Sequence, residues 1–98
     1  MSLNRWAKRR DASEPEIVSA LLQCGFSVER LDTPCDLLCG FRGKTFLVEC
    51  KVEGKKLNEN QQKFTDRWRG SRMVVLRSAQ DAIDWCVEVA AEMEGKAA

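Results

Sequence analysis

Asp36, Glu49 and Lys51 are residue types that could act together in metal-assisted chemistry. Residues 36–41 and 45–51 predict two strands of a hairpin closed by a two-residue turn. In that register Asp36 lies opposite Glu49, with Cβ atoms roughly 5 Å apart, and Lys51 emerges on the same face. Opposed carboxylates repel each other, and a hard cation such as Mg²⁺, which takes oxygen ligands, would remove the conflict.

The alternative is a solvated strand end that carries ordinary surface charges. Glu49 and Lys51 follow the apolar run 46–48 in a strand that we expect to be central. A charge in such a strand is expensive when it serves no purpose. The sequence therefore favours a functional site over a surface strand end.

Length and composition predict one small globular domain. The chain has 98 residues, of which 44% are hydrophobic and 32% charged. It has no apolar run of about 18 residues and no apolar segment behind the basic N-terminus, so we expect neither a membrane span nor secretion. Five cysteines fall within predicted helices and strands, which indicates reduced thiols in a cytoplasmic protein. The absence of histidine excludes Ser-His-Asp and Cys-His catalysis and argues against zinc.

The charges are unevenly distributed although their sum is only +1. Residues 42–72 hold nine basic and four acidic side chains, a local excess of +5, whereas residues 78–98 are acidic. Residues 1–12 form a basic arm without periodicity. This pattern suits a polyanionic partner, and the alternative is a mixed-charge surface. The expected nucleic-acid contacts are Arg9, Arg10, Arg42, Lys44, Lys55 and Lys56.

A first helix is predicted from Ser13, as N-cap, to about residue 24, with Glu16 completing a capping box. Its apolar stripe is continued by Glu14, which would therefore point inward as a third acidic group. The alternative for Glu14 is a first-turn acid that is favoured by the helix dipole.

A second helix is predicted over 59–69, with Asn58 as N-cap and an end at Gly70. Gln61 lies on its inward face, although a capping-box role alone would also explain it. A third helix is predicted over 79–94. Its expected apolar stripe, which is either core or in part a dimer surface, is Ala79, Ile83, Cys86, Ala90 and Met93, broadened by Trp85 and Val89.

Two further strands complete the predicted fold. Residues 26–31 alternate like an edge strand, and residues 72–77 indicate a buried strand. The order is then α-β-β-β-α-β-α, which predicts an α/β (α+β mixed) domain over 13–98 with a mixed central sheet flanked by helices.

The motifs in this order resemble the PD-(D/E)XK nuclease superfamily. The motifs are Glu14 in EPEIVSAL, the turn before Asp36, the run Glu49-Cys50-Lys51, and Gln61 in LNENQQKF. Within the superfamily the chain is similar to small phage-type VRR-NUC domains and, more distantly, to archaeal Holliday-junction resolvases. The resemblance covers roughly residues 13–85 and implies a restriction-endonuclease-like core. One departure is Cys35, which stands between the proline and Asp36.

The resemblance implies a role for each matched residue. Asp36, Glu49 and the Cys50 carbonyl would ligate Mg²⁺ or Mn²⁺, with the Cys50 side chain facing away from the site. Glu14 would contribute to the metal site, Lys51 would position or activate the attacking water, and Gln61 would orient the lysine or a phosphate.

We therefore expect a Mg²⁺-dependent DNA endonuclease that cleaves branched or structured DNA in a bacterial or phage-infected cell. So small a chain offers little DNA-binding surface, so a homodimer is expected, and a replication or repair helicase is a candidate partner. The alternatives are a catalytically inactive nucleic-acid-binding module of the same fold and a small protein-interaction domain.

Overall fold

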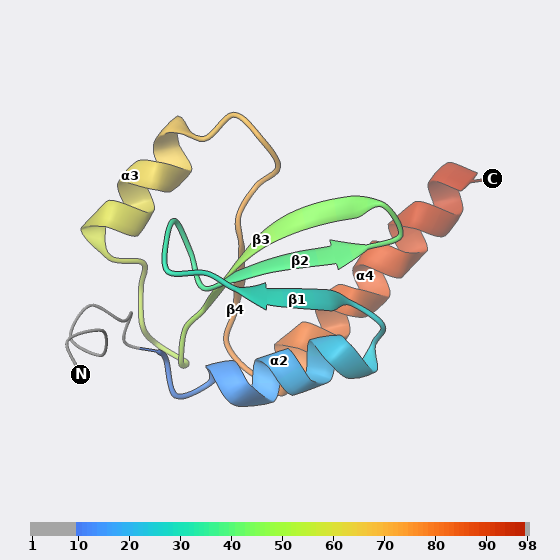
Figure 1. The fold of residues 1–98 in the computed structure, drawn as a ribbon, viewed down its shortest axis with the longest axis horizontal. Coiled ribbons are helices and arrows are strands. Elements are labelled where there is room, and N and C mark those ends of the chain that lie inside the picture. The colour runs from blue at the N-terminus through green and yellow to red at the C-terminus, as the bar shows by residue number, and fades with distance from the viewer. Residues whose placement is uncertain (1–9, 98) are drawn as a thin grey trace.

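A computed structural model describes residues 10–97 of the chain, and its element order matches the predicted one. The labels used below are those of Figure 1. The elements in chain order are α2 (Glu14–Gln23), β1 (Ser27–Arg30), β2 (Leu37–Phe41), β3 (Lys44–Cys50), α3 (Glu59–Arg67), β4 (Val74–Leu76) and α4 (Ala79–Ala97). The predicted mixed α/β fold is thereby confirmed.

The four strands form one sheet in the order β1-β2-β3-β4. The first three are antiparallel, and β4 runs parallel to β3 after the crossover through α3. The β2–β3 ladder runs from Phe41↔Lys44 to Leu37↔Val48, which is the predicted register. Arg42 and Gly43 both have positive φ, at 48° and 82°. This conformation gives a two-residue turn whose twist matches that of the strands.

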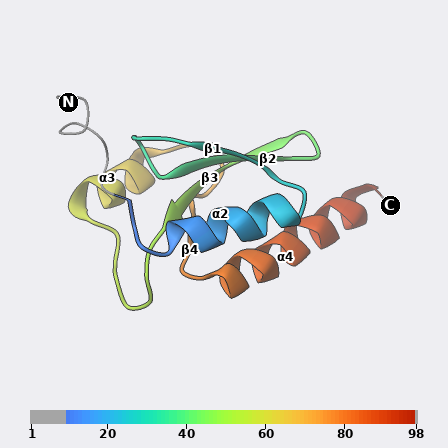
Figure 2. The same cartoon turned by 60° about the horizontal axis from the view of Figure 1, so that its bottom comes forward.

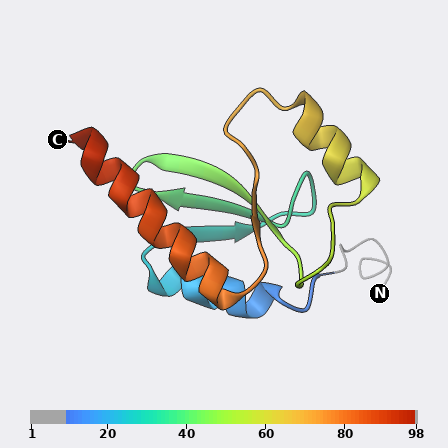
Figure 3. The same cartoon turned by 180° about the vertical axis from the view of Figure 1, so that it is seen from behind.

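Two helices cover one face of the sheet, as Figures 1 and 2 show for α2 and α4. The main core lies between them and the sheet, and Figure 3, which shows the molecule from behind, has α4 crossing in front of the strands. Its fully buried members include Ile17, Leu21, Leu37, Cys39, Val48 and Ala82. Helix α3 lies toward the opposite face, where a smaller cluster joins Cys35, Phe64 and Met73. One face of the sheet is therefore covered by α2 and α4, and α3 lies toward the other.

Three helix details differ from the predictions. Ser13 has helical backbone angles and makes no side-chain cap, so the predicted capping box with Glu16 is absent. Helix α3 ends at Arg67 rather than at residue 69, because Trp68 already has an extended backbone. On α4, Cys86 and Val89 are buried as predicted, whereas Ile83 is 40% exposed and Ala82, which was not predicted, is buried. The buried side of α4 therefore differs from the predicted stripe at these two positions, and it packs against α2.

Among residues 10–97, no helix combines the length and apolar character that crossing a membrane requires.

Candidate metal centre at the end of the sheet

The predicted site residues gather where β2 begins and β3 ends. Asp36 directly precedes β2, and Glu49 and Cys50 are the last two residues of β3. The ladder stops at Leu37↔Val48, one step before Asp36 would pair with Glu49. The Asp36 carboxylate turns to the neighbouring backbone instead, and its Oδ2 accepts a hydrogen bond of 2.8 Å from the Cys50 N–H. Asp36 therefore lies at the end of the sheet, just outside the paired part of β2 and β3.

On the side of the sheet that α2 covers, Asp36 lies close to Glu14 and Cys50. One carboxylate oxygen from each acid and the Cys50 Sγ all lie within 4.8 Å of one another. All three residues are buried, with Glu14 1% and Asp36 2% exposed. Glu14 reaches this position because it continues the inward stripe of α2, as predicted. The three side chains form the candidate metal centre.

On the α3 side, Glu49 meets Gln61 and Lys51. Glu49 is 2% exposed, and its Oε2 accepts a hydrogen bond from the Gln61 Nε2. The Lys51 Nζ lies 3.7 Å from the same oxygen. Gln61 also caps α3, because its Oε1 accepts from the Asn58 N–H while the Asn58 side chain accepts from the Gln61 N–H. Gln61 therefore has both predicted roles: its Nε2 points inward to Glu49, and its Oε1 takes part in the capping box of α3.

The strand pairing stops before it reaches Asp36 and Glu49, so the two acids are not opposed as ladder partners. Among the described residues, the group of three carboxylate and thiol side chains whose atoms lie within 4.8 Å of one another is Glu14, Asp36 and Cys50. The physical reason is that Asp36 leaves the strand geometry to bind the Cys50 N–H. Glu49 keeps its strand orientation and faces α3.

The Cys50 side chain faces Glu14 and Asp36, which corrects the expectation that it points away from the site. Burial raises the pKa of the Cys50 thiol above its ordinary value, and the charges of Asp36, Glu14 and Glu49 raise it further. Burial, together with Cys35, likewise raises the pKa of Cys39 to about 12. Cys50 therefore remains a neutral thiol, whereas thiol metal ligands bind as thiolates.

Two arginines supply positive charge to the buried acids. Arg30 Nε lies 2.8 Å from Glu14 Oε2. Arg10 Nη1 lies 3.4 Å from Glu14 Oε1 and 3.9 Å from Asp36 Oδ1, and it also donates to the Asp36 backbone oxygen. Buried carboxylates need such partners, since a buried charge without one is strongly destabilising. Arg10, the last basic residue of the N-terminal arm, is thus part of the site.

Sequence reasoning missed Asp11, which ties the start of α2 to the chain that follows Lys51. Its carboxylate accepts from the Ser13 N–H and hydroxyl and, at 3.3 Å, from the Val52 N–H. Burial would raise the pKa of Asp11, but these hydrogen bonds and the charge of Lys51 lower it overall. The available signal was an Asp two residues before Ser13, a spacing typical of a local side-chain turn.

Arg77 was also missed as a positioning residue. Its guanidinium donates to the backbone oxygens of Val52, at 3.2 Å, and Lys55. This side chain fixes the loop that follows the candidate site. No local sequence pattern indicates the contact, because β4 approaches β3 only through the crossover.

The expected nucleic-acid contacts are not all near the centre. Arg42 and Lys44 lie at the hairpin turn, about 20 Å from Cys50 at the usual rise of a strand. Lys55 and Lys56 are exposed in the loop after Lys51, and Arg9 lies outside the described residues. Of this set, the structure places Arg10 in direct contact with the acids. Arg42 and Lys44 are separated from them because an extended hairpin puts its turn and its ends at opposite edges.

We compared the chain with known protein families, with curated proteins and with solved structures, and none of the three comparisons gave a match.

Proposed function

We propose that this protein is a metal-dependent nuclease that hydrolyses DNA phosphodiester bonds at the end of its sheet. The observation that carries the proposal is the pair Glu14 and Asp36, whose oxygens lie within 4.8 Å of each other in the protein interior. A third buried carboxylate, Glu49, directly precedes Cys50 in β3, and the partly buried Lys51 lies 3.7 Å from its Oε2. Burying several charged groups together destabilises the folded state, and such clusters are found mainly at functional sites.

The donor set fits Mg²⁺ or Mn²⁺ better than a soft metal. Glu14 and Asp36 have hard carboxylate oxygens within 4.8 Å of each other, and Glu49 directly precedes Cys50 in β3. The Cys50 thiol is the wrong donor for these cations and stays protonated, so the Cys50 backbone carbonyl is the proposed ligand at that position. When bound, a divalent cation supplies a Lewis acid that polarises the scissile phosphate and lowers the pKa of water.

Lys51 and Gln61 act on the substrate side of this scheme. The Lys51 ammonium is held near Glu49, so it can hydrogen-bond an attacking water and stabilise negative charge that develops on the phosphate. Gln61 fixes the Glu49 carboxylate through its Nε2 while its Oε1 is held by the N-terminus of α3. With no histidine in the chain, proton transfer runs through water, Lys51 or a carboxylate.

The decisive experiment combines metal binding with cleavage. We expect Mn²⁺ or Mg²⁺ to raise the melting temperature and to support cleavage of plasmid and branched DNA. Asp36→Ala should abolish both effects, whereas Lys51→Ala should abolish cleavage and retain the metal-induced rise. The matched controls are Asp84→Ala on the exposed side of α4 and Arg72→Ala, an exposed cation outside the expected nucleic-acid contacts. A wild-type protein that neither binds these metals nor cleaves DNA would overturn the proposal.

A non-cleaving nucleic-acid-binding module is the second candidate, and one observation favours it. Both Glu14 oxygens already contact a guanidinium, from Arg10 and Arg30, so the acids are compensated by the protein's own charges. In that case a gel shift would show DNA binding that weakens with salt, without cleavage and without a metal-induced rise in melting temperature.

We further propose that the protein acts as a homodimer, with a replication or repair helicase as a candidate partner. Ile83 and Val87 lie one turn apart on α4 and are 40% and 64% exposed. Light scattering should give a dimer that Val87→Asp converts to a monomer. A monomeric wild-type protein at micromolar concentration would contradict this proposal.

A further inference from the structure

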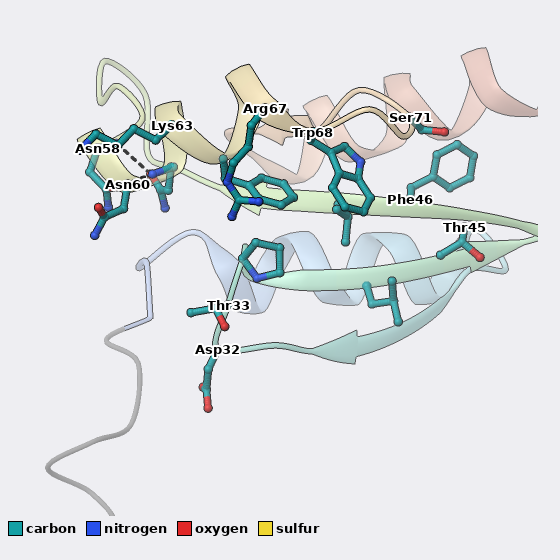
Figure 4. A pocket seen from close by; sticks show the side chains of 15 residues that line it. Asp32, Thr33, Thr45, Phe46, Asn58, Asn60, Lys63, Arg67, Trp68 and Ser71 are labelled. Carbon is teal, nitrogen blue, oxygen red and sulfur yellow. Dashed lines mark hydrogen bonds between the residues drawn. The ribbon is translucent and has the colours of Figure 1, made fainter.

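A groove lies between α3 and the face of β2 and β3 that α2 does not cover, as Figure 4 shows. Its volume is about 1120 Å³. The strands contribute Leu38 and Leu47, and α3 with the residue that follows it contributes Phe64, Arg67 and Trp68. The walls are therefore largely apolar and aromatic, and they are open to solvent beside a site proposed to act on phosphates.

Trp68 is held in place although 46% of it is exposed. Its ring stacks on Phe64 with the centroids 5.2 Å apart and the planes inclined by 27°. Gly70 lies directly against the indole, because a Cβ at that position would be 2.6 Å from the Trp68 Nε1. An aromatic ring that is fixed by packing and half open to solvent has the properties of a base-stacking platform.

Positive side chains accompany the aromatic wall. The Arg67 guanidinium lies over the Phe64 ring, 5.1 Å from its centroid, and Lys63 is exposed beside it with Glu59 at 3.4 Å. Asp32 is the acidic residue that lines the groove, and it already lies 3.6 Å from an Arg10 nitrogen. The groove thus combines two cations for phosphates with an apolar surface for base faces.

The groove also leads toward the candidate metal centre. Gln61 lines it and donates to Glu49, which directly precedes Cys50 of the candidate metal centre in β3. A duplex presents phosphates and sugars outward and hides its base faces, whereas an unpaired strand exposes them. The apolar wall therefore matches unpaired nucleotides rather than a duplex.

We infer that this groove binds single-stranded nucleic acid, with a base stacked on Trp68 and phosphates bound by Lys63 and Arg67. The inference rests on the proposed nuclease function and specifies its substrate class. The substrate is a strand with an unpaired segment, which enters along α3 and passes Gln61 on its way to the carboxylates.

The test measures binding in EDTA, so that it is independent of cleavage. Fluorescence anisotropy would compare labelled oligo(dT), oligo(U) and a duplex of equal length. We expect both single strands to bind more tightly than the duplex, and the ratio of the two single-strand affinities distinguishes DNA from RNA as the preferred strand. Trp68→Leu should weaken single-strand binding about tenfold, given the usual contribution of one stacked base. Arg67→Gln should weaken it severalfold and reduce the salt dependence by about one phosphate contact.

Gly70→Ala provides a variant that keeps the tryptophan but displaces its ring. It should weaken single-strand binding, while Gly95→Ala, where a Cβ meets nothing within 4 Å, should not. Equal binding of duplex and single strands, no oligonucleotide binding, or unchanged affinity in both Trp68→Leu and Gly70→Ala would overturn the inference. The metal-induced rise in melting temperature should persist in Trp68→Leu. The groove and the metal centre can therefore fail separately.

Discussion

The two ends of the β2–β3 hairpin are built from opposite kinds of residue. At the turn end, Phe26 stacks on Phe41 with centroids 4.4 Å apart, and Trp85 packs 5.1 Å from both Phe26 and Phe46. At the other end, buried positions are taken by carboxylates, a thiol and an amide. The same two strands therefore carry an apolar cluster at the turn end of the hairpin and the candidate metal centre at its open end.

This difference indicates how the fold separates stability from function. Apolar side chains at the turn end stabilise the sheet in proportion to the surface they bury. The acids at the other end repel one another and need Arg10, Arg30 and Lys51 nearby. Sites of this kind commonly cost stability, which the rest of the protein must supply. Mutations at the two ends should therefore separate into stability effects and functional effects.

The largest expected change is at the apolar end. Phe26→Ala removes a side chain that is 3% exposed, and we expect it to lower the free energy of unfolding by about 3–5 kcal/mol. Urea denaturation would measure this loss, with Leu22→Ala on the exposed side of α2 as a control that should change little. Metal binding by the folded fraction should stay the same. A selective loss of metal binding would break the separation.

The next effect concerns the polar end. Asp36→Asn keeps an acceptor for the Cys50 N–H and removes repulsion with Glu14, while it loses attraction to Arg10. We expect the metal-free unfolding free energy to change by less than about 1 kcal/mol. The stabilisation by Mn²⁺, about 2.7 kcal/mol at a hundredfold excess over the Kd, should vanish. Calorimetry with and without Mn²⁺ measures both quantities, and an intact Mn²⁺ effect would contradict the assignment.

A smaller effect tests whether Arg10 competes with a metal. Arg10→Gln removes a cation from beside Glu14 and Asp36, so metal affinity should rise about fivefold, equivalent to roughly 1 kcal/mol. Titration calorimetry with Mn²⁺ would detect the change, with the exposed Arg69→Gln as the charge-matched control. Weaker binding in Arg10→Gln would instead show that Arg10 helps to form the cation site.

An effect of similar size is expected at Asp11. Asp11→Ala removes the acceptor for Ser13 and Val52 and should cost about 1 kcal/mol at neutral pH. Because folding lowers the pKa of Asp11, its contribution is complete above the usual value of 3.8 and is lost as pH falls through the folded-state value. The difference from wild type should therefore shrink in acid. Denaturation at pH 7 and pH 3 would check this, and a constant difference would contradict it.

Several features followed from local sequence. The two-residue turn set the hairpin register, and the helix period placed Glu14 and Gln61 inward, as the structure confirms. These features depend on neighbours within a few residues, so pattern and turn chemistry are sufficient. The Asn58 cap is of the same kind.

Other features required the folded chain. The contacts of Arg10 with Asp36, of Asp11 with Val52 and of Arg77 with Val52 join segments 25 or more residues apart. No periodicity encodes them. The Ser13 cap failed for a local reason, because the Ser13 N–H and hydroxyl both donate to Asp11, two residues earlier, and the hydroxyl does not cap the helix.

The sequence by itself determined the order of elements, the register of the central hairpin and the set of acids that converge on its open end. Only the tertiary structure decided how those acids divide, with Asp36 and Glu14 meeting on one side of the sheet and Glu49 turned to Gln61 on the other. The reason is geometric. A residue inside a strand has its direction fixed by the pleat, but Asp36 stands just outside the strand, where the backbone hydrogen bond from Cys50 determines its direction.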